Sequence, residues 1–540
     1  MRHRVAAVTA ALVGSVVAGI GAAAPPAGAA VTARHFGVTV GAASEPSVTI
    51  KAIDREGKAV PVSASLESAA SDDVQDTLTS AHAAKVPAGT YNVAAWVWEP
   101  GKKAATLIDR AVTITSSMTV TFDARPGKPV RFTVNDATVK QQAVAAEPFS
   151  PAAGQVAQWN HSYGPPIDGP AVYVVPGPLP AGWDILLQAN LVRPETGDRV
   201  SPVEYDLVKI LSGSIPSNPT FASTRAGLAQ DHVTIRDFGQ GIDGVLFDPE
   251  EYGDGSGYGR LPSLELGQQN VLTPASVDVF FSPGYRWESV SYAANNDVYG
   301  TPLLAGRTYS QTFNAAVFSP SPLFGPTVFG NILASNETFG DCILVDGANQ
   351  GEGTESVGLY PTDPQGWLYQ GGKLIAHVSG YGKNFTAKIP ATAQTYTMKV
   401  EATRVNQDNS PVTGFARSVT ATYTFTTEAG DDSLAGANFW PRMIPQGVSE
   451  KNAAAGGSKT TVPITFNTVN GAIAAHNVGV WASVNGGKTW TALNVTRSGG
   501  AWSVSVGNPR KAGWVSLKVR GEDAAGFEAT VTVINAYAVS

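Results

Sequence analysis

Cysteine is almost absent from this chain. Cys342 is the single cysteine in 540 residues, so no intrachain disulfide can form. The fold must therefore rely on its hydrophobic cores, and a hydrophobic content of 43% is enough for several of them. Because a free cysteine often acts as a small core hydrophobe, we interpret Cys342 as a packing residue rather than a catalytic nucleophile.

An excess of positive charge is missing as well. The formal net charge is -7 at pH 7, whereas a nucleic-acid-binding domain usually carries a clustered basic surface. The sequence therefore predicts no nucleic-acid partner.

Long apolar runs are absent beyond the N-terminus, so we expect no membrane span in the mature chain. Arg2 and Arg4 precede an apolar stretch over residues 5–24, and small residues follow at 27–30. This three-part pattern is typical of a secretory signal peptide. A membrane anchor is the alternative, but the Ala/Gly-rich run and the small residues favour cleavage. We predict a signal peptide over residues 1–30 and a secreted, extracellular protein.

Familiar catalytic and metal-binding motifs are also missing. The sequence contains neither a Gly-x-Ser-x-Gly nucleophile elbow nor a phosphate-binding loop. Its histidines outside the signal peptide do not stand at metal-ligand spacing. They are His35, His82, His161, His232, His377 and His476. We assign no catalytic residue and expect no cofactor, with calcium as the one alternative considered next.

One acidic, glycine-containing segment resembles a calcium loop in composition. Residues 248–257 read Asp-Pro-Glu-Glu-Tyr-Gly-Asp-Gly-Ser-Gly, which supplies hard oxygen ligands and flexible glycines. The ligand spacing is not that of an EF-hand, and a solvated surface turn is the simpler interpretation. Glu250 and Glu251 are not expected to act as a glycosidase pair, because neighbours on a strand point to opposite faces.

Strand patterns dominate what is present. Residues 395–403 and 418–426 alternate between apolar and polar side chains, so one face packs and the other meets water. Fifty-seven glycines and 36 prolines supply frequent turns. The predicted fold class is all-β, with several antiparallel β-sandwich modules in tandem, of prealbumin-like and immunoglobulin/fibronectin-like type.

Breaks in composition divide the mature chain into four modules. We expect a prealbumin-like β-sandwich at 31–138, a linker at 139–154, β-sandwich modules at 155–302 and 303–428, and an immunoglobulin/fibronectin-like β-sandwich at 429–540. The boundary between the second and third modules is the least defined of these. In the last module, Asn485-Gly486 between two strand patterns predicts a hairpin.

Aromatic residues in the first module suggest a binding surface. Along residues 91–98, alternation gives Tyr91 to the core face and places Trp96 and Trp98 together on the opposite face. We interpret the tryptophan pair as a contact with the neighbouring module, with a sugar-binding platform as the alternative. Tyr91 is expected to lock a turn, as in a tyrosine corner.

Several stretches, taken in order, carry a family resemblance. They are residues 89–98, 173–176, 205–208, 282–287, 308–318, 484–490 and 524–531. Their order resembles the non-catalytic region that follows the protease domain in secreted subtilisin-like serine peptidases of actinobacteria. The protease domain itself is missing: its Asp, His and Ser motifs do not occur, no histidine is followed by glycine, and residues 353–356 do not match the serine motif.

These observations favour a secreted, non-catalytic protein that acts as a binding or scaffold module outside the cell. Its partner would be another exported protein or a cell-wall polymer. Two alternatives remain open at this point. One is a remnant or companion of a subtilisin-like peptidase, and the other is a hydrolase whose site lies near residues 248–254.

Overall fold

A computed structural model describes most of the chain. The described residues are 45–68, 75–102, 104–149, 171–194, 201–237, 242–252, 266–291, 296–298, 303–313, 315–319, 326–329, 332–335, 342–344, 355–357, 362–379, 386–404, 413–431, 440–468, 471–498 and 501–540. The predicted signal peptide lies outside them.

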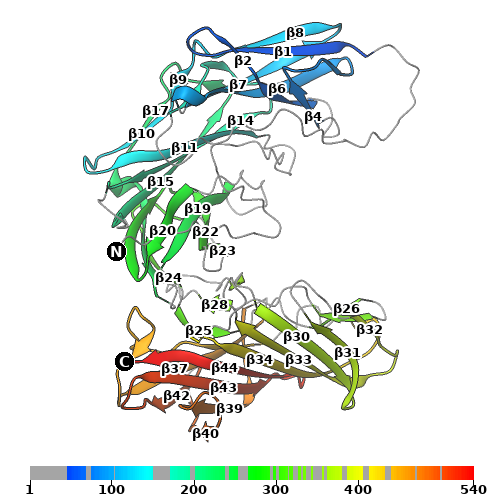
Figure 1. Cartoon of the computed structure of the whole chain (residues 1–540), viewed down its shortest axis with the longest axis vertical. Helices are drawn as coiled ribbons and strands as arrows, with labels where there is room; N and C mark the ends of the chain where they lie inside the picture. Colours follow the sequence, from blue (N-terminus) through cyan, green and yellow to red (C-terminus); the bar gives the residue numbers. More distant parts are fainter. Residues whose placement is uncertain are drawn as a thin grey trace, which may run out of the picture.

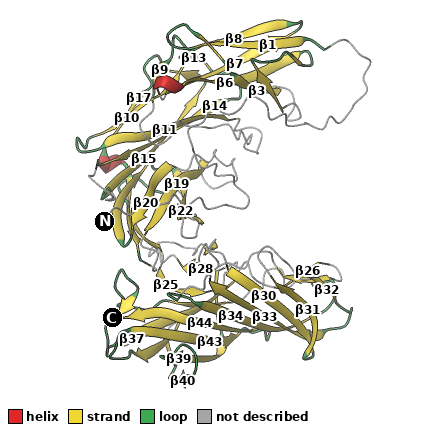
Figure 2. Ribbon diagram, in the orientation of Figure 1, coloured by secondary structure: helices red, strands yellow, loops and turns green. Residues whose placement is uncertain are grey.

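Strands make up nearly all of the described secondary structure, and the all-β prediction is confirmed (Figure 2). Helices in this part of the chain are limited to two single-turn 3-10 helices, η1 (Pro100–Lys102) and η3 (Arg225–Gly227). Within the same residues, no helix has the length and apolarity needed to cross a bilayer.

Two sheets form the N-terminal module. The first sheet runs β2-β1-β5, with β8 paired to β1, and consists of β1 (Ser47–Ile53), β2 (Ala59–Val60), β5 (Ala84–Lys85) and β8 (Met118–Asp123). The second sheet runs β4-β3-β6-β7-β12-β9 and consists of β3 (Ser63–Ser68), β4 (Gln75–Thr79), β6 (Gly89–Glu99), β7 (Ala104–Ile114), β9 (Lys128–Pro129) and β12 (Ala171–Val174).

Two further sheets follow along the chain. The third sheet runs β11-β14-β15-β21-β18-β24 and consists of β11 (Lys140–Phe149), β14 (Asp184–Val192), β15 (Val203–Ser212), β18 (Ala229–Ile235), β21 (Ala275–Phe281) and β24 (Thr308–Phe313). The fourth runs β20-β19-β22-β23 and consists of β19 (Ile242–Tyr252), β20 (Leu266–Leu272), β22 (Tyr285–Ser291) and β23 (Asn296–Val298).

The C-terminal part is built on a nine-stranded sheet. It runs β31-β30-β33-β34-β44-β43-β39-β40, with β36 on β44, and consists of β30 (Thr362–Gln370), β31 (Lys373–Ser379), β33 (Gln394–Arg404), β34 (Ser418–Thr427), β36 (Ala453–Ala454), β39 (His476–Ser483), β40 (Thr491–Ala492), β43 (Gly513–Glu522) and β44 (Glu528–Val539).

A five-stranded sheet accompanies the nine-stranded one. It runs β35-β37-β42-β41, with β38 on β37, and consists of β35 (Trp440–Met443), β37 (Lys459–Thr468), β38 (Gly471–Ile473), β41 (Thr496–Ser498) and β42 (Ala501–Gly507).

Short strand groups complete the described fold. They are β10 (Arg131–Val134) with β17 (Thr220–Ser223); β13 (Gly177–Pro178) with β16 (Ser214–Ile215); β25 (Ala315–Ser319) with β28 (Cys342–Leu344) and β29 (Glu355–Val357); and β26 (Pro326–Phe329) with β27 (Ile332–Ser335) and β32 (Thr386–Lys388). The environment of Cys342 lies outside the described side chains.

The N-terminal sheets are stacked, and β6 lies in the middle of the stack (Figure 1). Val93 of β6 packs with Ile50 of β1 in a core between the first and second sheets. The next residue, Ala94, packs with Leu187 of β14 in a core between the second and third sheets. Because consecutive residues point to opposite faces, a strand buried on both sides must be apolar at both parities. The run Val-Ala-Ala-Trp-Val in β6 meets this requirement.

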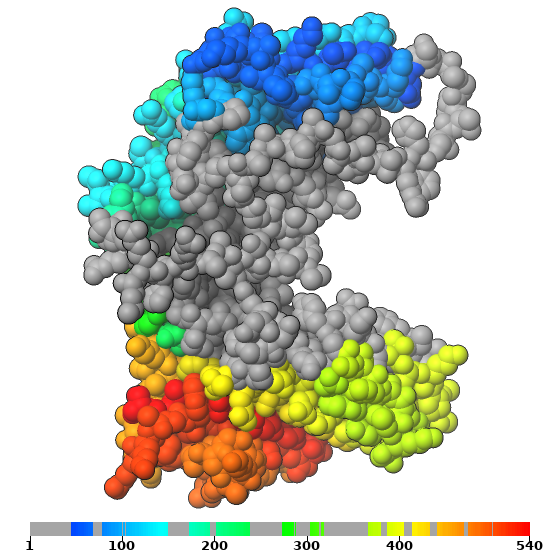
Figure 3. Space-filling view, in the orientation of Figure 1, coloured from blue at the N-terminus to red at the C-terminus, as the bar shows by residue number. Residues whose placement is uncertain are grey.

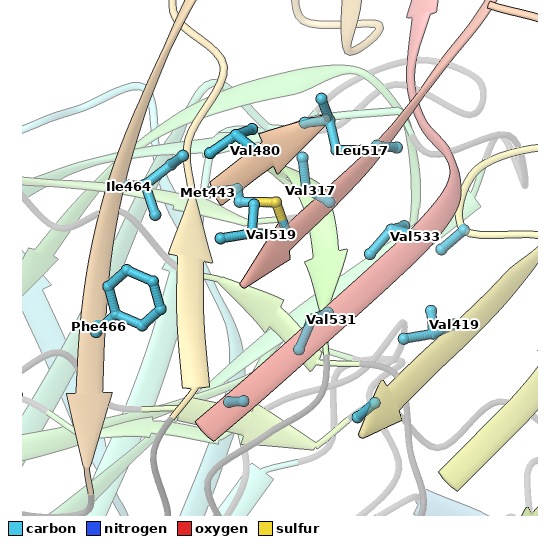
Figure 4. Close-up of a cluster of buried hydrophobic side chains, with 14 of the residues drawn as sticks. Val317, Val419, Met443, Ile464, Phe466, Val480, Leu517, Val519, Val531 and Val533 are labelled. Carbon is cyan, nitrogen blue, oxygen red and sulfur yellow. The ribbon is translucent and has the colours of Figure 1, made fainter. Parts of the chain in front are cut away.

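The C-terminal core lies between the nine-stranded and five-stranded sheets. Ile464 and Phe466 of β37 meet Leu517 of β43 and Val531 of β44 in one buried cluster (Figure 4). A Cβ placed on Gly521 would lie 2.3 Å from a ring carbon of Phe466, so the ring occupies the space above that glycine.

Several predicted module boundaries are wrong. The expected linker at 139–154 contains β11, an edge strand of the third sheet that pairs with β14. The expected break at 302/303 falls before β24, which pairs with β18 of the same sheet. The break at 428/429 separates β34 from β44, which are direct neighbours. Alternation along a strand defines its two faces but not its partner, so strands at module ends were assigned to loops or to the wrong module.

Two local predictions are confirmed. The Tyr91 hydroxyl donates a hydrogen bond to the Pro87 carbonyl at 2.8 Å, which closes the turn before β6. In the last module, β39 and β40 form an antiparallel pair in which Trp481 lies opposite Ala492, so the Asn-Gly segment connects a hairpin.

The turn around Asn452 connects the N-terminal and C-terminal parts. The Asp237 N–H donates to the Glu450 carbonyl at 2.9 Å. The Asn452 side chain donates to the Asp237 carbonyl at 3.1 Å and accepts from the Ala316 N–H at 2.9 Å. Its φ of 51° lies in the left-handed region, which asparagine tolerates better than most residues. One fully buried side chain thus bonds to segments more than one hundred residues away.

Candidate functional site

The predicted tryptophan pair lies on the face of β6 opposite Tyr91. Tyr91 is buried in the core between the first and second sheets. Trp96 is half-buried and packs against the core between the second and third sheets, which contains residues such as Val144 and Ile185 from the next module. Trp98 is also half-buried. A role of Trp96 and Trp98 in ligand binding stays a prediction.

The predicted calcium segment lies largely outside the described side chains. Its first residues, Asp248 to Tyr252, form the end of β19, and those from Gly253 onward are not described. The pairing of β19 with β22 shifts register between Pro249 and Glu251, so Glu250 is the extra residue of a β-bulge. Pro249 lies beyond Phe247, where the pairing with β20 ends, so at the proline β19 is paired on one side only, which suits a residue without an N–H.

The described histidines do not gather at one place. His232 meets Asp278 at 3.0 Å, whereas His377 stacks on Trp367 with ring centroids 5.4 Å apart. His476 lies 3.7 Å from Glu522. Within the described residues, no group of three or more His, Cys, Asp or Glu side chains is arranged to hold a metal ion.

Buried carboxylates in the third sheet are the feature closest to a hydrolase site. Glu204 and Asp206 are two residues apart on β15, so they share a face. The Asn190 amide donates to both, to Asp206 at 2.9 Å. Glu204 is 1% exposed and Asp206 is fully buried, so an external substrate does not reach either group. We interpret the cluster as part of the packing between sheets.

A second buried carboxyl lies on β7. Burial raises the pKa of Asp109 to about 7, although hydrogen bonds from the Asn92 side chain and the Arg110 backbone act in the opposite direction. Asp109 faces the core shared with the third sheet, because it lies opposite Ala94 in the ladder of β6 and β7. Its ionisation is therefore coupled to the packing of two sheets rather than to a surface site.

The outer face of the nine-stranded sheet combines hydroxyl groups with aromatic rings. Val419, Ala421 and Tyr423 of β34 point into the core, so the intervening threonines point outward. We call this the threonine face. Its defining residues are half-buried or exposed, and they are Thr395, Thr397, Thr420, Thr422, Thr424, Thr426, Thr530 and Thr532.

The threonine face is continuous across the strands. One row of directly opposed residues runs from β30 through β33, β34 and β44 to β43. The row consists of Trp367, Lys399, Thr422, Thr530 and Arg520. At about 4.8 Å per strand, the five spacings from β30 to β39 extend over roughly 24 Å.

Charged side chains on this face balance one another. Among the described side chains on the outer face of β33, β34, β43 and β44, the basic residues are Lys399, Lys518 and Arg520, and the acidic residues are Glu401, Glu522 and Glu528. Lys399 pairs with Glu401 at 2.9 Å, and Arg520 pairs with Glu528. The face is therefore close to neutral.

Two indoles lie at the β39 end of the threonine face. A Cβ on Gly479 would fall 2.6 Å from the Trp481 ring, which shows that this ring lies over the glycine. The Lys518 Nζ lies 4.7 Å from the Trp490 ring centroid and 5.9 Å from that of Trp481. We call Trp481, Trp490 and Lys518 the tryptophan platform.

The hairpin loop that carries Trp490 is held by its own polar side chains. Asn485 Oδ1 accepts from the Thr489 N–H at 3.0 Å, and Ser483 Oγ accepts from the Gly487 N–H at 3.0 Å. Gly487 has a φ of 81° and stands against Ile534 of β44, so the loop rests on the outer face. The hairpin follows from the local Asn485-Gly486 signal, whereas the platform depends on the pairing of β39 with β43, which no local pattern records.

Comparison with known proteins identifies no family. No family model and no curated protein matches the chain. Among solved structures, a chimeric titin Z1Z2-Z1Z2 tandem matches with a TM-score of 0.15 and 16% identity over 40% of this chain and 96% of its own.

Two bacterial proteins match over a longer stretch. Escherichia coli alpha-2-macroglobulin matches with a TM-score of 0.14, and Salmonella alpha-2-macroglobulin with 0.17, each at 11% identity over 92% of this chain. The matched region spans 52% and 40% of their respective lengths. These scores are too low to support an argument about function. The chain is a protein of multiple β-sandwich modules, as its own sheets establish.

Proposed function

We propose that this chain is an exported binding or scaffold protein that engages another exported protein or a cell-wall polymer. The observation that carries the proposal is the threonine face with its tryptophan platform. Hydroxyl groups both donate and accept hydrogen bonds, and half-buried indoles supply contact area, so the face offers what a binding surface needs.

Export is supported by sequence alone. Arg2 and Arg4, the apolar stretch and the small residues before Val31 form the pattern of a signal peptide. The single cysteine is compatible with an extracellular location, because no disulfide pairing is required for the sheets to close.

The experiment is affinity capture with the mature chain purified from culture medium. The protein is immobilised and incubated with culture supernatant and with fragmented cell wall, and the retained material is identified by mass spectrometry. We expect a component that free protein displaces and that is lost with Trp481→Ala. Retention that is unchanged by this substitution, or no specific retention, would contradict the proposal.

A companion measurement addresses the peptidase and hydrolase alternatives. The protein is incubated with casein and with a fluorophosphonate probe, which labels activated serine residues. Because the three triad motifs are missing from the sequence, we expect neither cleavage nor labelling. Labelling of one serine that disappears when it is replaced by alanine would establish a catalytic site instead.

A further inference from the structure

We propose that the ligand of the threonine face is a neutral polysaccharide chain that lies across the strands and stacks on the tryptophan platform. This inference rests on the binding function proposed above and specifies the chemistry of its partner. The charge, the hydroxyl groups and the ring placement of this face support it.

Charge is the first argument. The ion pairs Lys399–Glu401 and Arg520–Glu528 lie within the face. The Lys518 ammonium makes cation–π contacts with the rings of Trp481 and Trp490. A surface that selects a polyanion presents an unbalanced positive field, whereas this one is close to neutral. Charge complementarity therefore favours an uncharged partner.

Hydroxyl groups are the second argument. The Thr395 and Thr426 hydroxyls lie 3.4 Å apart, and those of Thr397 and Thr424 lie 3.5 Å apart. Hydrogen bonds between hydroxyls are usually about 2.7–2.8 Å, so these pairs are long and weak. Each group can turn to donate to, or accept from, a sugar hydroxyl at little cost.

Ring placement is the third argument. Trp481 lies over Gly479 and is half-buried, so part of its ring remains accessible beside the threonine hydroxyls. An aromatic surface beside rows of hydroxyl groups suits a sugar ring, which has both apolar C–H and polar O–H edges. The roughly 24 Å between β30 and β39 gives an extended chain room for several contacts.

A protein partner fits this face less well. Protein interfaces usually have an apolar centre that becomes fully buried. The large apolar side chains exposed in the described residues are Leu304, Leu374 and Val484, which belong to three separate segments rather than to one patch. The threonine face is broad and polar, with aromatic area confined to its ends.

The test is depletion binding of the full mature chain to insoluble polymers. Microcrystalline cellulose and chitin are the neutral probes, and phosphocellulose is the charged form of the first. We expect retention on at least one neutral polymer that 0.5 M salt does not reduce. Trp481→Ala should weaken the affinity at least about five-fold, since an aromatic contact of about 1 kcal/mol corresponds to that factor.

Further variants separate binding from folding. Gly479→Ala adds a methyl group where the Trp481 ring lies, and it should weaken binding while Trp481 is still present. Thr422→Val and Thr530→Val should weaken binding, whereas Thr113→Val, which removes an exposed hydroxyl paired with Thr90 in the first module, should not. Trp98→Ala tests the alternative site on the first module, where Trp96 and Trp98 share one face of β6.

The outcomes distinguish the two proposals. Loss of binding with Trp98→Ala but not with Trp481→Ala would overturn the inference and place the sugar site on the first module. Salt-sensitive retention on phosphocellulose alone would overturn it in favour of an anionic ligand. If neither neutral polymer retains the chain but an exported protein does, the binding function stands and the polysaccharide does not. If nothing is retained, both fail.

Discussion

The two halves of the molecule bury different kinds of polar groups. Among the described residues, those up to 231 include eight carboxylates that are at most 8% exposed. They are Asp54, Glu67, Glu99, Asp109, Glu147, Glu204, Asp206 and Asp231. From residue 232 onward, the buried polar residues that the structure describes are neutral, as with Asn508, whose side chain accepts from the Tyr537 hydroxyl at 3.0 Å.

This difference follows from how the sheets are layered. In the N-terminal half, β6 and β14 are covered on both faces, so polar residues on either face lose water. In the C-terminal half, the nine-stranded sheet has one buried face and one outer face that carries the charged residues. The yellow-to-red colours of Figure 3 place the C-terminal residues together at one end of the molecule. We expect the two halves to respond differently to pH.

The largest expected effect tests the neutral core of the C-terminal half. Phe466→Ala removes a ring that is 1% exposed and packed on Gly521, which should cost about 3–5 kcal/mol of unfolding free energy. Hydrogen exchange of peptides from β37, β43 and β44 measures the loss. The cost should be equal at pH 5 and pH 8. A difference above about 1 kcal/mol would show that this core contains a coupled charge.

The next effect concerns Asp109 in the N-terminal half. Its folded-state pKa of about 7 exceeds the ordinary value of 3.8, so the folded state retains a proton that the unfolded state releases. The unfolding free energy should therefore fall as pH rises from about 4 to 7, by up to about 4 kcal/mol, and level off above that. Asp109→Asn should remove this slope, as measured by hydrogen exchange of β6 and β7.

Asp123→Asn is the control for that slope. The exposed Asp123 carboxylate bonds to Arg125, which lowers its pKa, so any pH dependence it contributes has the opposite sign and lies below pH 4. If Asp109→Asn and Asp123→Asn left the same slope between pH 4 and 7, the proposed contrast between the halves would lose its main support.

The smallest expected effect comes from removing the hydrogen bonds of Asn452 that connect the two halves. Asn452→Gly keeps a residue that accepts a φ of 51° but removes the hydrogen bonds to Asp237 and Ala316. The loss should be about 1–3 kcal/mol, because the Ala316 N–H is left buried without its acceptor. Exchange should increase near residues 235–237 and 315–317 and stay unchanged in β43. Increased exchange throughout both halves would mean that they unfold as one unit.

Sequence patterns predicted the faces of strands well and their neighbours poorly. The alternation of Val419 and Thr420 gives the buried and outer faces of β34 correctly, because period two depends on the strand alone. The partners of β11 and β44 depend on contacts between distant segments, such as Ser418 opposite Ile534. No local pattern records that pairing, so the linker and the module boundaries were misplaced.

The candidate binding face likewise combines a feature that local sequence predicts with one that depends on distant segments. The hairpin before Trp490 follows from Asn485-Gly486, a local signal. The tryptophan platform requires Lys518 and Trp481 to be neighbours across β39 and β43, which only the assembled sheet provides. Trp96 and Trp98 share one strand, so their common face follows from local alternation alone.

If the chain is exported as we propose, the position of β44 determines the order in which the C-terminal half assembles. This strand lies between β34 and β43, so it joins residues 362–427 to residues 476–522 within a single sheet. A chain that crosses a membrane from its N-terminus exposes β30, β33 and β34 while β44 is still behind the membrane. The edge of β34 then remains unpaired, and the core side chains of Val419, Ala421 and Tyr423 remain exposed to solvent. We therefore expect the C-terminal half to need protection from aggregation until residue 539 has emerged.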